Sequence, residues 1–418
     1  MTWKTGILVM AGLALWAAGL KAQTPEQMGG IYYAYPEKDV ADAQLQAAPD
    51  GFKPVYVSHY GRHGSRWPVN AKIYKHTADF FQEQQLAQNL TDEGKAVWKL
   101  TTLCAGNAKG HLGELTPMGE RQHRGIATRM AVRVPSLFAD GARIEARSST
   151  EPRCIMSMAA FCEALKEVNG KLDLRRHATP GDMDFIHHKT EEADMMNSDV
   201  APWRWEFDPY RDSVSRCPAV AARLFREVPD TPALPLFMRS LYDIAISVQD
   251  IDGLEADLLS LFSADELKAL WKAANYIQYV GNGRSPLSGS SGPQCVRPLL
   301  DEMLTRADEM LESGDVAVDL RFGHDTDLLR LVSLMGIDDY GIESEDIDDV
   351  ATRWPNYRIA PMAANLQLIF YRDASGQELV QPLLNEHPAR IAGLNETAPG
   401  FYSWPAFKAR MSATHIEK

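Results

Sequence analysis

The sequence has little of what metal-binding, nucleic-acid-binding or membrane-spanning proteins need. Its 418 residues include only five cysteines, and no CxxC or Cys/His spacing is typical of zinc. The net charge of −13 argues against nucleic acid as a partner, because polyanion binding requires a broad basic surface. Beyond the first residues, no stretch is apolar enough to span a bilayer, and there are no internal repeats. We therefore expect no metal, no cofactor and no stable membrane insertion, which leaves room for a small anionic ligand in one basic cleft.

The cysteines are an odd number, so in an oxidising compartment at least one should stay free unless it pairs between chains. Cys154 and Cys162 fall in one predicted helix, about 12 Å apart, and cannot bridge each other. Cys217 with Cys295 is a pair that the sequence allows but does not establish. The pairing therefore stays open for the whole set of Cys104, Cys154, Cys162, Cys217 and Cys295.

The beginning of the chain has the pattern of a targeting segment. Lys4 precedes an apolar run from Gly6 to Leu20, and Ala22 supplies a small residue for cleavage. That run is short for a membrane span, although an uncleaved N-terminal anchor is the alternative. No cysteine follows it directly, which argues against a lipoprotein. We predict a signal peptide over residues 1–22 and a periplasmic or secreted protein of unspecified oligomeric state.

Strand and helix patterns alternate along much of the chain. Hydrophobic content of 45% and charged content of 24% are typical of a soluble globular protein. The alternation predicts an α/β fold: a doubly wound, mostly parallel sheet with helices on both faces. The expected strands are residues 54–59, 142–147, 316–322, 366–371 and 379–384. The expected helices on the sheet include 116–134, 153–169 and 328–335, and helical patterns also cover 73–84 and 91–103.

Residues 172–315 differ in character from both flanks. Strand signals are few, and prolines, tryptophans and helical patterns dominate. A glycine- and serine-rich stretch at 281–293 is interpreted as a flexible loop. We therefore predict a mostly helical inserted cap domain at 172–315, between α/β core segments at 23–171 and 316–418.

An unusual cluster of side chains follows the first predicted strand: Arg62-His63-Gly64-Ser65-Arg66. Arginine presents a planar fork that matches phosphate oxygens, and glycine lets the backbone come close to a ligand. A histidine between two such arginines therefore indicates an imidazole aimed at a bound anion.

Two later strand-to-helix junctions carry matching groups. Arg153 stands at a helix start soon after the strand at 142–147, and His324-Asp325 follow the strand at 316–322. The carboxyl ends of parallel strands gather at one edge of a sheet, where helix N-termini also point. Two histidines, three arginines and one carboxylate are thus expected to converge on one phosphate-sized anion.

Together these motifs, in this order, resemble the histidine acid phosphatases, the second branch of the histidine phosphatase superfamily. The family pattern is Arg-His-Gly-x-Arg-x-Pro near the N-terminus, an arginine that opens a central helix, and His-Asp late in the chain. Arg62 to Pro68, Arg153 and His324-Asp325 match it in turn. Residues 115–119 (Leu-Thr-Pro-Met-Gly) also resemble the family's Leu-Thr-x-x-Gly helix start.

The resemblance implies a role for each residue. His63 would be the nucleophile that forms a phosphohistidine, and Asp325 would protonate the leaving alkoxide and then help water to attack. The phosphoryl oxygens would be held by Arg62, Arg66, Arg153 and His324. A neutral imidazole is nucleophilic near its ordinary pKa of about 6.5, so the attack needs no metal. We expect phosphate oxygens to raise the pKa of Asp325, and activity at acidic to neutral pH that is insensitive to chelators.

The resemblance also narrows the substrate. Phytases and multiple inositol polyphosphate phosphatases are the nearest candidates, so we expect an exported, metal-independent phosphomonoesterase acting on inositol phosphates such as phytate. The second group usually has His-Ala-Glu where this chain has His324-Asp325-Thr326, which makes that assignment less secure. A broad-specificity acid phosphatase, a phosphotransferase or mutase, and a phosphate-ligand binder without activity are the alternatives.

Other polar residues nearby have simpler interpretations. His59 is expected in the core or behind the site, and Arg147 is expected to be structural. His187 and His188 are expected at the surface or in a structural role, with contact to a substrate's outer phosphates as the alternative.

Two members of the site itself also have structural alternatives. Asp325 could cap the helix that continues through Leu328, alone or in addition to acting as the acid. Arg153 could pair only with Glu151 or another surface carboxylate.

Overall fold

The computed structural model describes residues 23–38 and 45–414. The predicted signal peptide, residues 1–22, lies outside the described residues. Within the described ranges, no helix is both long enough and apolar enough to cross a membrane.

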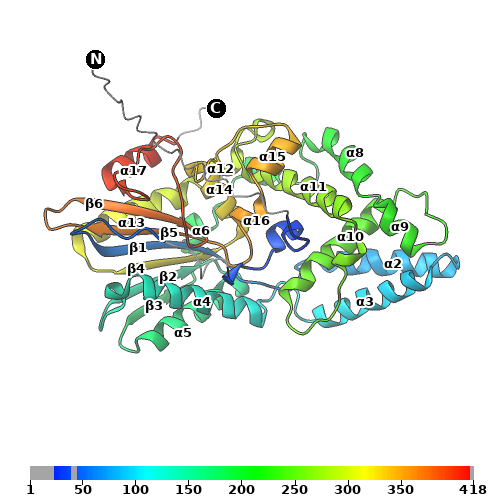
Figure 1. Cartoon of the computed structure of the whole chain (residues 1–418), viewed down its shortest axis with the longest axis horizontal. Coiled ribbons are helices and arrows are strands. Elements are labelled where there is room, and N and C mark those ends of the chain that lie inside the picture. Colours follow the sequence, from blue (N-terminus) through cyan, green and yellow to red (C-terminus); the bar gives the residue numbers. More distant parts are fainter. Residues whose placement is uncertain (1–22, 39–44, 415–418) are drawn as a thin grey trace, which may run out of the picture.

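An eight-stranded sheet occupies one half of the molecule (Figure 1). Its strands are β1 (Lys53–Arg62), β2 (Arg143–Ser148), β3 (Asp173–His177), β4 (Val318–Gly323), β5 (Asn365–Arg372), β6 (Glu378–Leu384), β7 (His387–Pro388) and β8 (Tyr402–Ser403). The order is β3-β2-β4-β1-β5-β6-β7, and β8 pairs with β6. The strands from β3 to β1 are parallel to one another, and β5 begins an antiparallel extension. The site residues come from the parallel side of this sheet.

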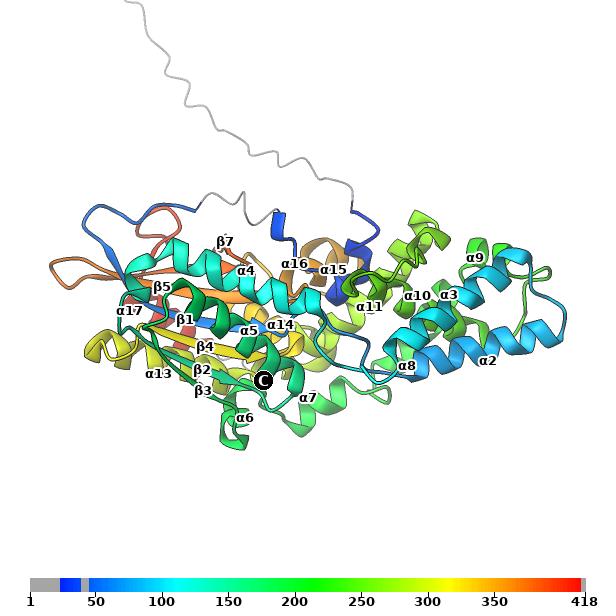
Figure 2. The ribbon, with the colours of Figure 1, turned by 90° about the horizontal axis from the view of Figure 1, so that it is seen from below.

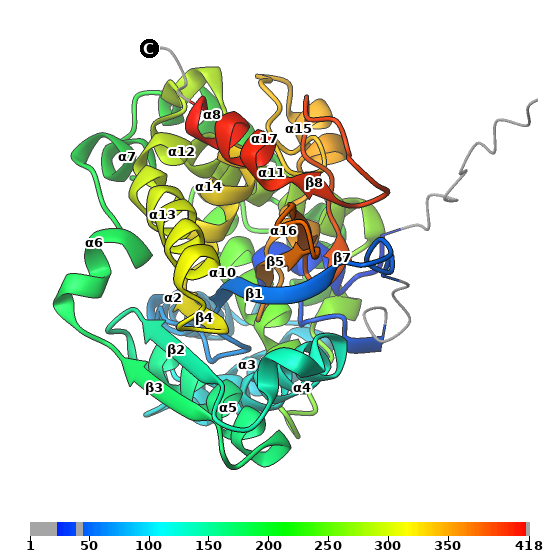
Figure 3. The same cartoon turned by 90° about the vertical axis from the view of Figure 1, so that its left-hand side faces the viewer.

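Helices cover both faces of the sheet, as Figure 3 shows. One face carries α4 (Pro117–Arg133) and α5 (Pro152–Val168). The other carries α13 (Arg297–Ser313), α14 (Asp325–Met335) and α17 (Trp404–Ser412). The predicted doubly wound α/β fold is confirmed.

The central strands have apolar side chains on both of their faces because helices cover both. In β1, Val57 points into the cluster that contains Phe161 of α5, whereas Tyr56 and Tyr60 belong to the cluster with Leu329 of α14. All six residues of β4 are buried. Such continuous burial is typical of parallel strands between two helical layers.

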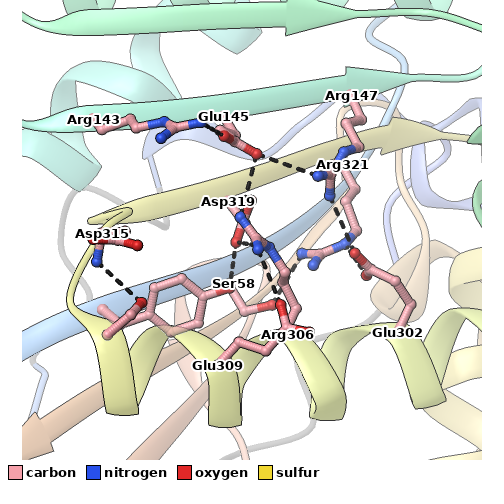
Figure 4. A network of polar contacts seen from close by, with 12 residues as sticks. Ser58, Arg143, Glu145, Arg147, Glu302, Arg306, Glu309, Asp315, Asp319 and Arg321 are labelled. Carbon is pink, nitrogen blue, oxygen red and sulfur yellow. Dashed lines mark hydrogen bonds and ion pairs between the residues drawn. The ribbon is translucent and has the colours of Figure 1, made fainter.

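A network of charged side chains, the sheet network, lies between α13 and strands β2 and β4 (Figure 4). Arg321 Nε lies 2.6 Å from Glu302 Oε2, and Arg147 Nη1 lies 3.2 Å from Glu302 Oε1. Arg306 Nη2 lies 3.2 Å from Glu145 Oε2. These contacts agree with the structural interpretation of Arg147. The charged members of the sheet network are Arg143, Arg147, Arg306, Arg321, Glu145, Glu302, Glu309 and Asp319.

A helical part fills the other half of the molecule, and Figure 2 shows α2 and α3 running side by side at its far end. Its main helices are α2 (Lys72–Leu86), α3 (Asp92–Ala108), α8 (Arg204–Val214), α9 (Pro218–Leu224), α10 (Leu234–Ser247) and α11 (Ala264–Asn282). One hydrophobic cluster joins all of these except α8: Phe81 of α2, Val97 of α3, Leu224 of α9, Phe237 of α10 and Trp271 of α11 belong to it.

The helical part does not follow the predicted boundaries. α2 and α3 precede residue 172, yet they pack against helices that follow it. β3 lies inside the range predicted as insertion, 172–315, but pairs with β2 in the sheet. Its sequence, Asp-Leu-Arg-Arg-His, is mostly exposed at the sheet edge, so it has no apolar strand pattern to recognise. The shorter elements of this range are η3 (Pro180–Asp182), α6 (Met183–Ile186), α7 (Glu191–Met196), η4 (Val248–Asp250) and η5 (Leu259–Leu261).

The glycine- and serine-rich stretch is not the flexible loop that its composition predicted. It contains η6 (Pro286–Ser288) and α12 (Ser291–Cys295), and α12 packs against α14. Gly292 is buried against the carbonyl of Gly281, where a side chain would not fit. Close backbone packing therefore explains the small residues. The remaining short helices are η1 (Gln27–Tyr32), η2 (Pro135–Phe138), α15 (Ile347–Arg353) and α16 (Asn356–Ile359).

All five cysteines are free and buried. The Cys217–Cys295 pair that the sequence allowed is not formed. Cys217 belongs to the hydrophobic cluster of the helical part, whereas Cys295 Sγ donates a hydrogen bond to the carbonyl of His188 at 3.1 Å. The two thiols therefore lie in different surroundings and act as small core side chains.

Candidate active site

The loop that follows β1 is held against the N-terminus of α4. Thr116 caps α4 by accepting a hydrogen bond from the Gly119 amide, with Pro117 at the first helical position. A Cβ on Gly64 would lie 2.5 Å from the Gly119 carbonyl oxygen, so only glycine fits there. The sequence motifs at residues 62–68 and 115–119, which are about 50 residues apart in the chain, thus pack directly against each other.

His63 lies buried in this loop, with 1% of its surface exposed. Its Nδ1 is 2.9 Å from the Gly64 carbonyl oxygen. A carbonyl can only accept a hydrogen bond, so Nδ1 carries the proton and Nε2 keeps its lone pair. Burial lowers the pKa of His63 well below its ordinary value, and the charges of Arg62 and Arg66 add to that effect. The ring is therefore a neutral imidazole with a free Nε2.

Arg62, at the end of β1, is completely buried and held from behind. Its Nη1 donates to the carbonyl oxygens of Ile31 at 2.5 Å and Ala360 at 2.9 Å. Its Nη2 lies 3.4 Å from Asp325 Oδ2, and neither Nε nor Nη2 has a hydrogen-bond partner among the described residues. This leaves a rigid guanidinium with donors free for an anion.

Arg66 is held in a different way. Its guanidinium carbon lies 4.9 Å from the centre of the Tyr32 ring, and Nη1 donates to the Tyr32 hydroxyl at 3.3 Å. Nη1 also donates to the Trp67 carbonyl at 3.2 Å. Among the described residues, Nε has no hydrogen-bond partner. Cation–π stacking therefore orients Arg66 without neutralising its charge.

Arg153 is the second residue of α5, the helix that follows β2 after a short turn. Its Nη1 lies 2.9 Å from Glu151 Oε2, the contact that the structural alternative predicted. Its Nη2 also lies 3.4 Å from His324 Nδ1, so the same side chain reaches the junction after β4.

His324 occupies the N-cap position of α14, where it faces both Arg153 and His63. Arginine can only donate, so His324 Nδ1 accepts from Arg153 and Nε2 carries the proton toward Ser149 Oγ, 3.2 Å away. Burial lowers the pKa of His324 to about 4, although Asp327 opposes this shift. The rings of His324 and His63 have their centres 5.9 Å apart.

Asp325 begins α14 and is not its N-cap. Burial tends to raise the pKa of Asp325, but Arg62, Arg66 and His324 outweigh it, and the net shift is downward. The upward shift expected from phosphate oxygens concerns the occupied site and stays a prediction. Without a phosphate, no ligand charge offsets the arginine charges that act on this carboxylate.

Comparison with known proteins places the geometry in a family. Residues 61–385 match the family model of the histidine phosphatase superfamily, branch 2. The chain belongs to this family. Multiple inositol polyphosphate phosphatase 1 of Gallus gallus is 24% identical over 375 residues, which cover 85% of this chain and 81% of the chicken protein. The chain is accordingly a phosphatase.

Solved structures show the same fold. The multiple inositol polyphosphate phosphatase of Bifidobacterium longum, in complex with phosphate, superimposes with a TM-score of 0.78 at 19% identity, over 94% of this chain and 98% of that one. The phytase from D. castellii gives a TM-score of 0.69 at 14% identity, over 97% and 90% of the two chains.

Two residues beside the phosphatase motifs were missed or underrated. His187 Nδ1 lies 2.8 Å from Asp327 Oδ2, and the His187 ring is centred 4.4 Å from that of His324. His187 was expected at the surface or in a structural role, and Asp327 carried no signal because an acid in the first helical turn is common. His188, by contrast, contacts Cys295 through its carbonyl.

The imidazole of His59 lies behind the phosphatase site in an aromatic cluster. Its ring is centred 5.3 Å from Phe161 and 5.5 Å from Phe322. Burial lowers the pKa of His59 to about 3, and both ring nitrogens lack hydrogen-bond partners among the described residues. The core interpretation of His59 is confirmed. Over the described ranges, no three His, Cys, Asp or Glu side chains are grouped so that they could hold a metal ion.

Proposed function

We propose that this phosphatase hydrolyses phosphomonoesters through a phosphohistidine on His63, without a metal, and that inositol phosphates such as phytate are its substrates. The observation that carries the proposal is the neutral His63, whose free Nε2 is buried among the charges of Arg62, Arg66 and Arg153. A phosphoryl group placed there would meet a nucleophile and a preorganised set of donors together.

The proposed first step transfers the phosphoryl group to the protein. His63 Nε2 attacks phosphorus while the bond to the ester oxygen breaks, and Asp325 gives its proton to that oxygen. The Nδ1 proton stays on the ring, where the Gly64 carbonyl stabilises the positive charge of the phosphorylated imidazole. The transferring oxygens are held by Arg62, Arg66, Arg153 and His324.

In the second step, water attacks the phosphohistidine and Asp325 takes up the proton that the water loses. His63 leaves as neutral imidazole, which restores the starting state. For the first step Asp325 must be protonated, although its pKa is lowered in the free protein. A bound phosphate dianion offsets the charges of Arg62 and Arg66, so substrate itself raises the pKa of Asp325.

The substrate class rests on the relatives. The chicken and human proteins that match this chain are both named multiple inositol polyphosphate phosphatase 1, and structural neighbours include phytases. One B. longum structure was solved with inositol hexasulfate. His324-Asp325-Thr326 departs from the His-Ala-Glu pattern that multiple inositol polyphosphate phosphatases usually have, so small phosphate esters are the alternative substrates. The predicted leader makes the periplasm or the exterior the proposed location.

The proposal is tested by measuring phosphate release from phytate and from p-nitrophenyl phosphate, with chelator present. We expect the wild type to hydrolyse both and His63→Ala to lose at least about 10⁴-fold in kcat. His387→Ala, which removes an exposed histidine of β7, is the matched control and should keep full activity. Full activity of His63→Ala would overturn the mechanism, whereas hydrolysis of the small ester alone would overturn only the inositol phosphate assignment.

Two other functions give different products in the same assay. A phosphotransferase or mutase would return the group to a hydroxyl, so an added acceptor alcohol would become phosphorylated in place of water. A binding protein would take up phytate without releasing phosphate. The presence of both a nucleophile and an acid argues against a binding protein, and the predicted export away from cytosolic metabolites argues against a mutase.

A further inference from the structure

The loop that follows β1 and carries His63 and Arg66 is called the phosphate-binding loop below. Its residue Ser65 forms a hydrogen bond through each of its polar atoms. Its amide donates to Gln122 Oε1 at 2.9 Å, and its carbonyl accepts from the Thr116 amide at 2.9 Å. Its hydroxyl oxygen lies 2.9 Å from Gln122 Nε2 and 2.6 Å from Asp250 Oδ1. All four of these residues are buried.

The direction of these hydrogen bonds follows from their chemistry. The Gln122 Nε2 group can only donate, so the Ser65 hydroxyl accepts from it and directs its own proton to Asp250. Asp250 is therefore the acceptor at the end of a short chain that runs from α4 through the loop to η4. It comes from the helical part of the molecule, whereas the loop belongs to the sheet.

Asp250 is also placed where its charge matters. The carboxyl group is fully buried, and within the described residues its Oδ2 has no hydrogen-bond partner. The charged groups that act on it are Arg66 and Arg62, the two arginines of the loop. From α4 it faces the uncharged Gln122, and on its own segment the next acid, Asp252, is paired with Arg121 at 2.7 Å.

We propose that Asp250 is a positioning residue that fixes the phosphate-binding loop through Ser65 and, when ionised, weakens the binding of the phosphoryl group by opposing Arg62 and Arg66. The inference rests on the proposed function, since it concerns the same loop. It goes further because it assigns a working role to an acid outside the family motifs, contributed by the helical part.

The charge of Asp250 changes in the range in which such an effect is measurable. Burial raises the pKa of Asp250 to about 7, while the Ser65 hydrogen bond and the two arginines oppose the shift. Below this value the group is neutral and leaves the arginines to the ligand. Above it, a buried negative charge competes with the bound anion. In the ligand-free protein the pKa values of His63, His324 and Asp325 are all lowered, so these groups keep one charge state as the pH passes through neutrality. Any shift that a bound anion causes in them is common to the wild type and Asp250→Asn, so the difference between the two reports Asp250.

Sulfate is the probe for this effect because it keeps its double negative charge throughout, unlike a phosphate ester. Its inhibition constant against p-nitrophenyl phosphate, and its affinity by calorimetry, are measured at about pH 6 and about pH 8. The wild type should bind sulfate about 5-fold more weakly at the higher pH. Asp250→Asn, which keeps an acceptor for Ser65, should change less than about 2-fold between the two pH values and keep a kcat close to wild type.

Matched variants separate charge from position. Asp252→Asn removes an exposed acid two residues away and should keep the wild-type pH dependence. Asp250→Ala removes the acceptor as well as the charge and should lower kcat about 10- to 100-fold at both pH values, because the loop is no longer fixed.

The outcomes are decisive in both directions. An unchanged pH dependence of sulfate affinity in Asp250→Asn would overturn the charge effect. A normal kcat in Asp250→Ala would overturn the positioning role, and if that variant does not fold, Ser65→Ala takes its place. If the wild type binds sulfate at this site but hydrolyses no ester, the proposed function fails while the sulfate measurements still test Asp250.

Discussion

Two buried clusters of arginine in this molecule differ in how their positive charges are balanced. In the sheet network, Arg321 lies 2.6 Å from Glu302. In the active-site loop, Arg62 lies 3.4 Å from its carboxylate partner, and Arg66 forms no ion pair within 4.0 Å with any described residue. Carboxylates balance the arginine charges in the sheet network, whereas the loop after β1 keeps an excess of positive charge.

The difference is reflected in the proton affinity of the most buried arginine of each cluster, Arg321 and Arg62, whereas Tyr32 and the nearby acids raise the pKa of Arg66. Burial alone would lower the pKa of Arg321, but Glu302 and Asp319 more than compensate and raise it. Burial lowers the pKa of Arg62, and Asp325 offsets only part of that effect. A buried guanidinium without sufficient counter-charge is costly unless an anion binds to it. The comparison therefore explains why arginine crosslinks the fold in one place and, in our proposal, binds a ligand in the other.

The largest effect on the comparison is expected from Asp325→Asn, which removes the carboxylate beside Arg62. Hydrolysis of phytate should fall about 10²- to 10⁴-fold in kcat, because the alkoxide then leaves without a proton. p-Nitrophenyl phosphate should lose far less, since its leaving group needs little protonation, and sulfate should bind more tightly. Steady-state kinetics on both esters check this, and equal losses would contradict the role of Asp325 as acid.

The sheet network is broken by Arg321→Met, which removes the buried partner of Glu302 and leaves that carboxylate only the less buried Arg147. The free energy of unfolding should fall by about 3–5 kcal/mol, with kcat and KM of the folded protein unchanged. Denaturant unfolding measures the first and kinetics the second. Arg143→Met is the matched control at the partly exposed rim of the network, where a loss of at most about 1 kcal/mol is expected.

The opposite result is expected for Arg66→Gln in the unbalanced cluster. Here kcat/KM should fall about 10²- to 10³-fold, because one preorganised donor to the phosphoryl group is lost. The free energy of unfolding should change less than in Arg321→Met, since no described carboxylate within ion-pair distance depends on Arg66. Arg121→Gln, at an exposed ion pair, is the control. If Arg66→Gln lost stability and kept its activity, Arg66 would stabilise the fold as Arg321 does, and the contrast between the two clusters would be wrong.

The last effect, which is absent at neutral pH and appears only in acid, concerns the histidines beneath the site. Burial lowers the pKa of His59 and of His123 to about 3, from ordinary values of 6.5. The unfolded chain therefore takes up protons below pH 6.5 that the folded chain refuses, and stability falls as the pH falls toward 3. Each histidine should cost about 3 kcal/mol at about pH 4.

His59→Phe should remove about half of this acid destabilisation. Denaturant unfolding at about pH 7 and about pH 4 measures the difference, with His177→Phe, at an exposed strand end, as the control. An equal loss in His59→Phe and wild type would show that the acid sensitivity arises elsewhere.

Local patterns were enough to predict most of the fold. The strand expected at 316–322 is β4 (Val318–Gly323), and the helix expected at 116–134 is α4, with Thr116 as its cap. These elements can be recognised from the sequence because the spacing of their apolar residues and their capping residues are both local signals. β3 was missed because an exposed edge strand has no such pattern. The Gly/Ser stretch was wrongly predicted as a flexible loop because glycine and serine are common both in flexible loops and where backbones pack closely.

The candidate site shows the same division. Six site residues could be selected from the sequence because each stands at a strand-to-helix junction: Arg62, His63, Arg66, Arg153, His324 and Asp325. The structure brings them together, while their catalytic roles stay a prediction. Asp250 and Asp327 could not be selected, since nothing in their local sequence relates them to the loop after β1, and His187 was considered only as an alternative contact to a substrate.

The sequence by itself determined the family, the order of the core elements and the residue types that meet at the carboxyl ends of the parallel strands. Only the tertiary structure decided which arginines are neutralised and which stay free, and that the pKa of Asp325 is lowered before substrate binds. The physical reason is that charge balance acts over a few ångströms between groups that lie far apart in the chain. Glu302 reaches Arg321 because α13 packs against the sheet, and Asp250 reaches Ser65 because η4 of the helical part lies against the loop after β1.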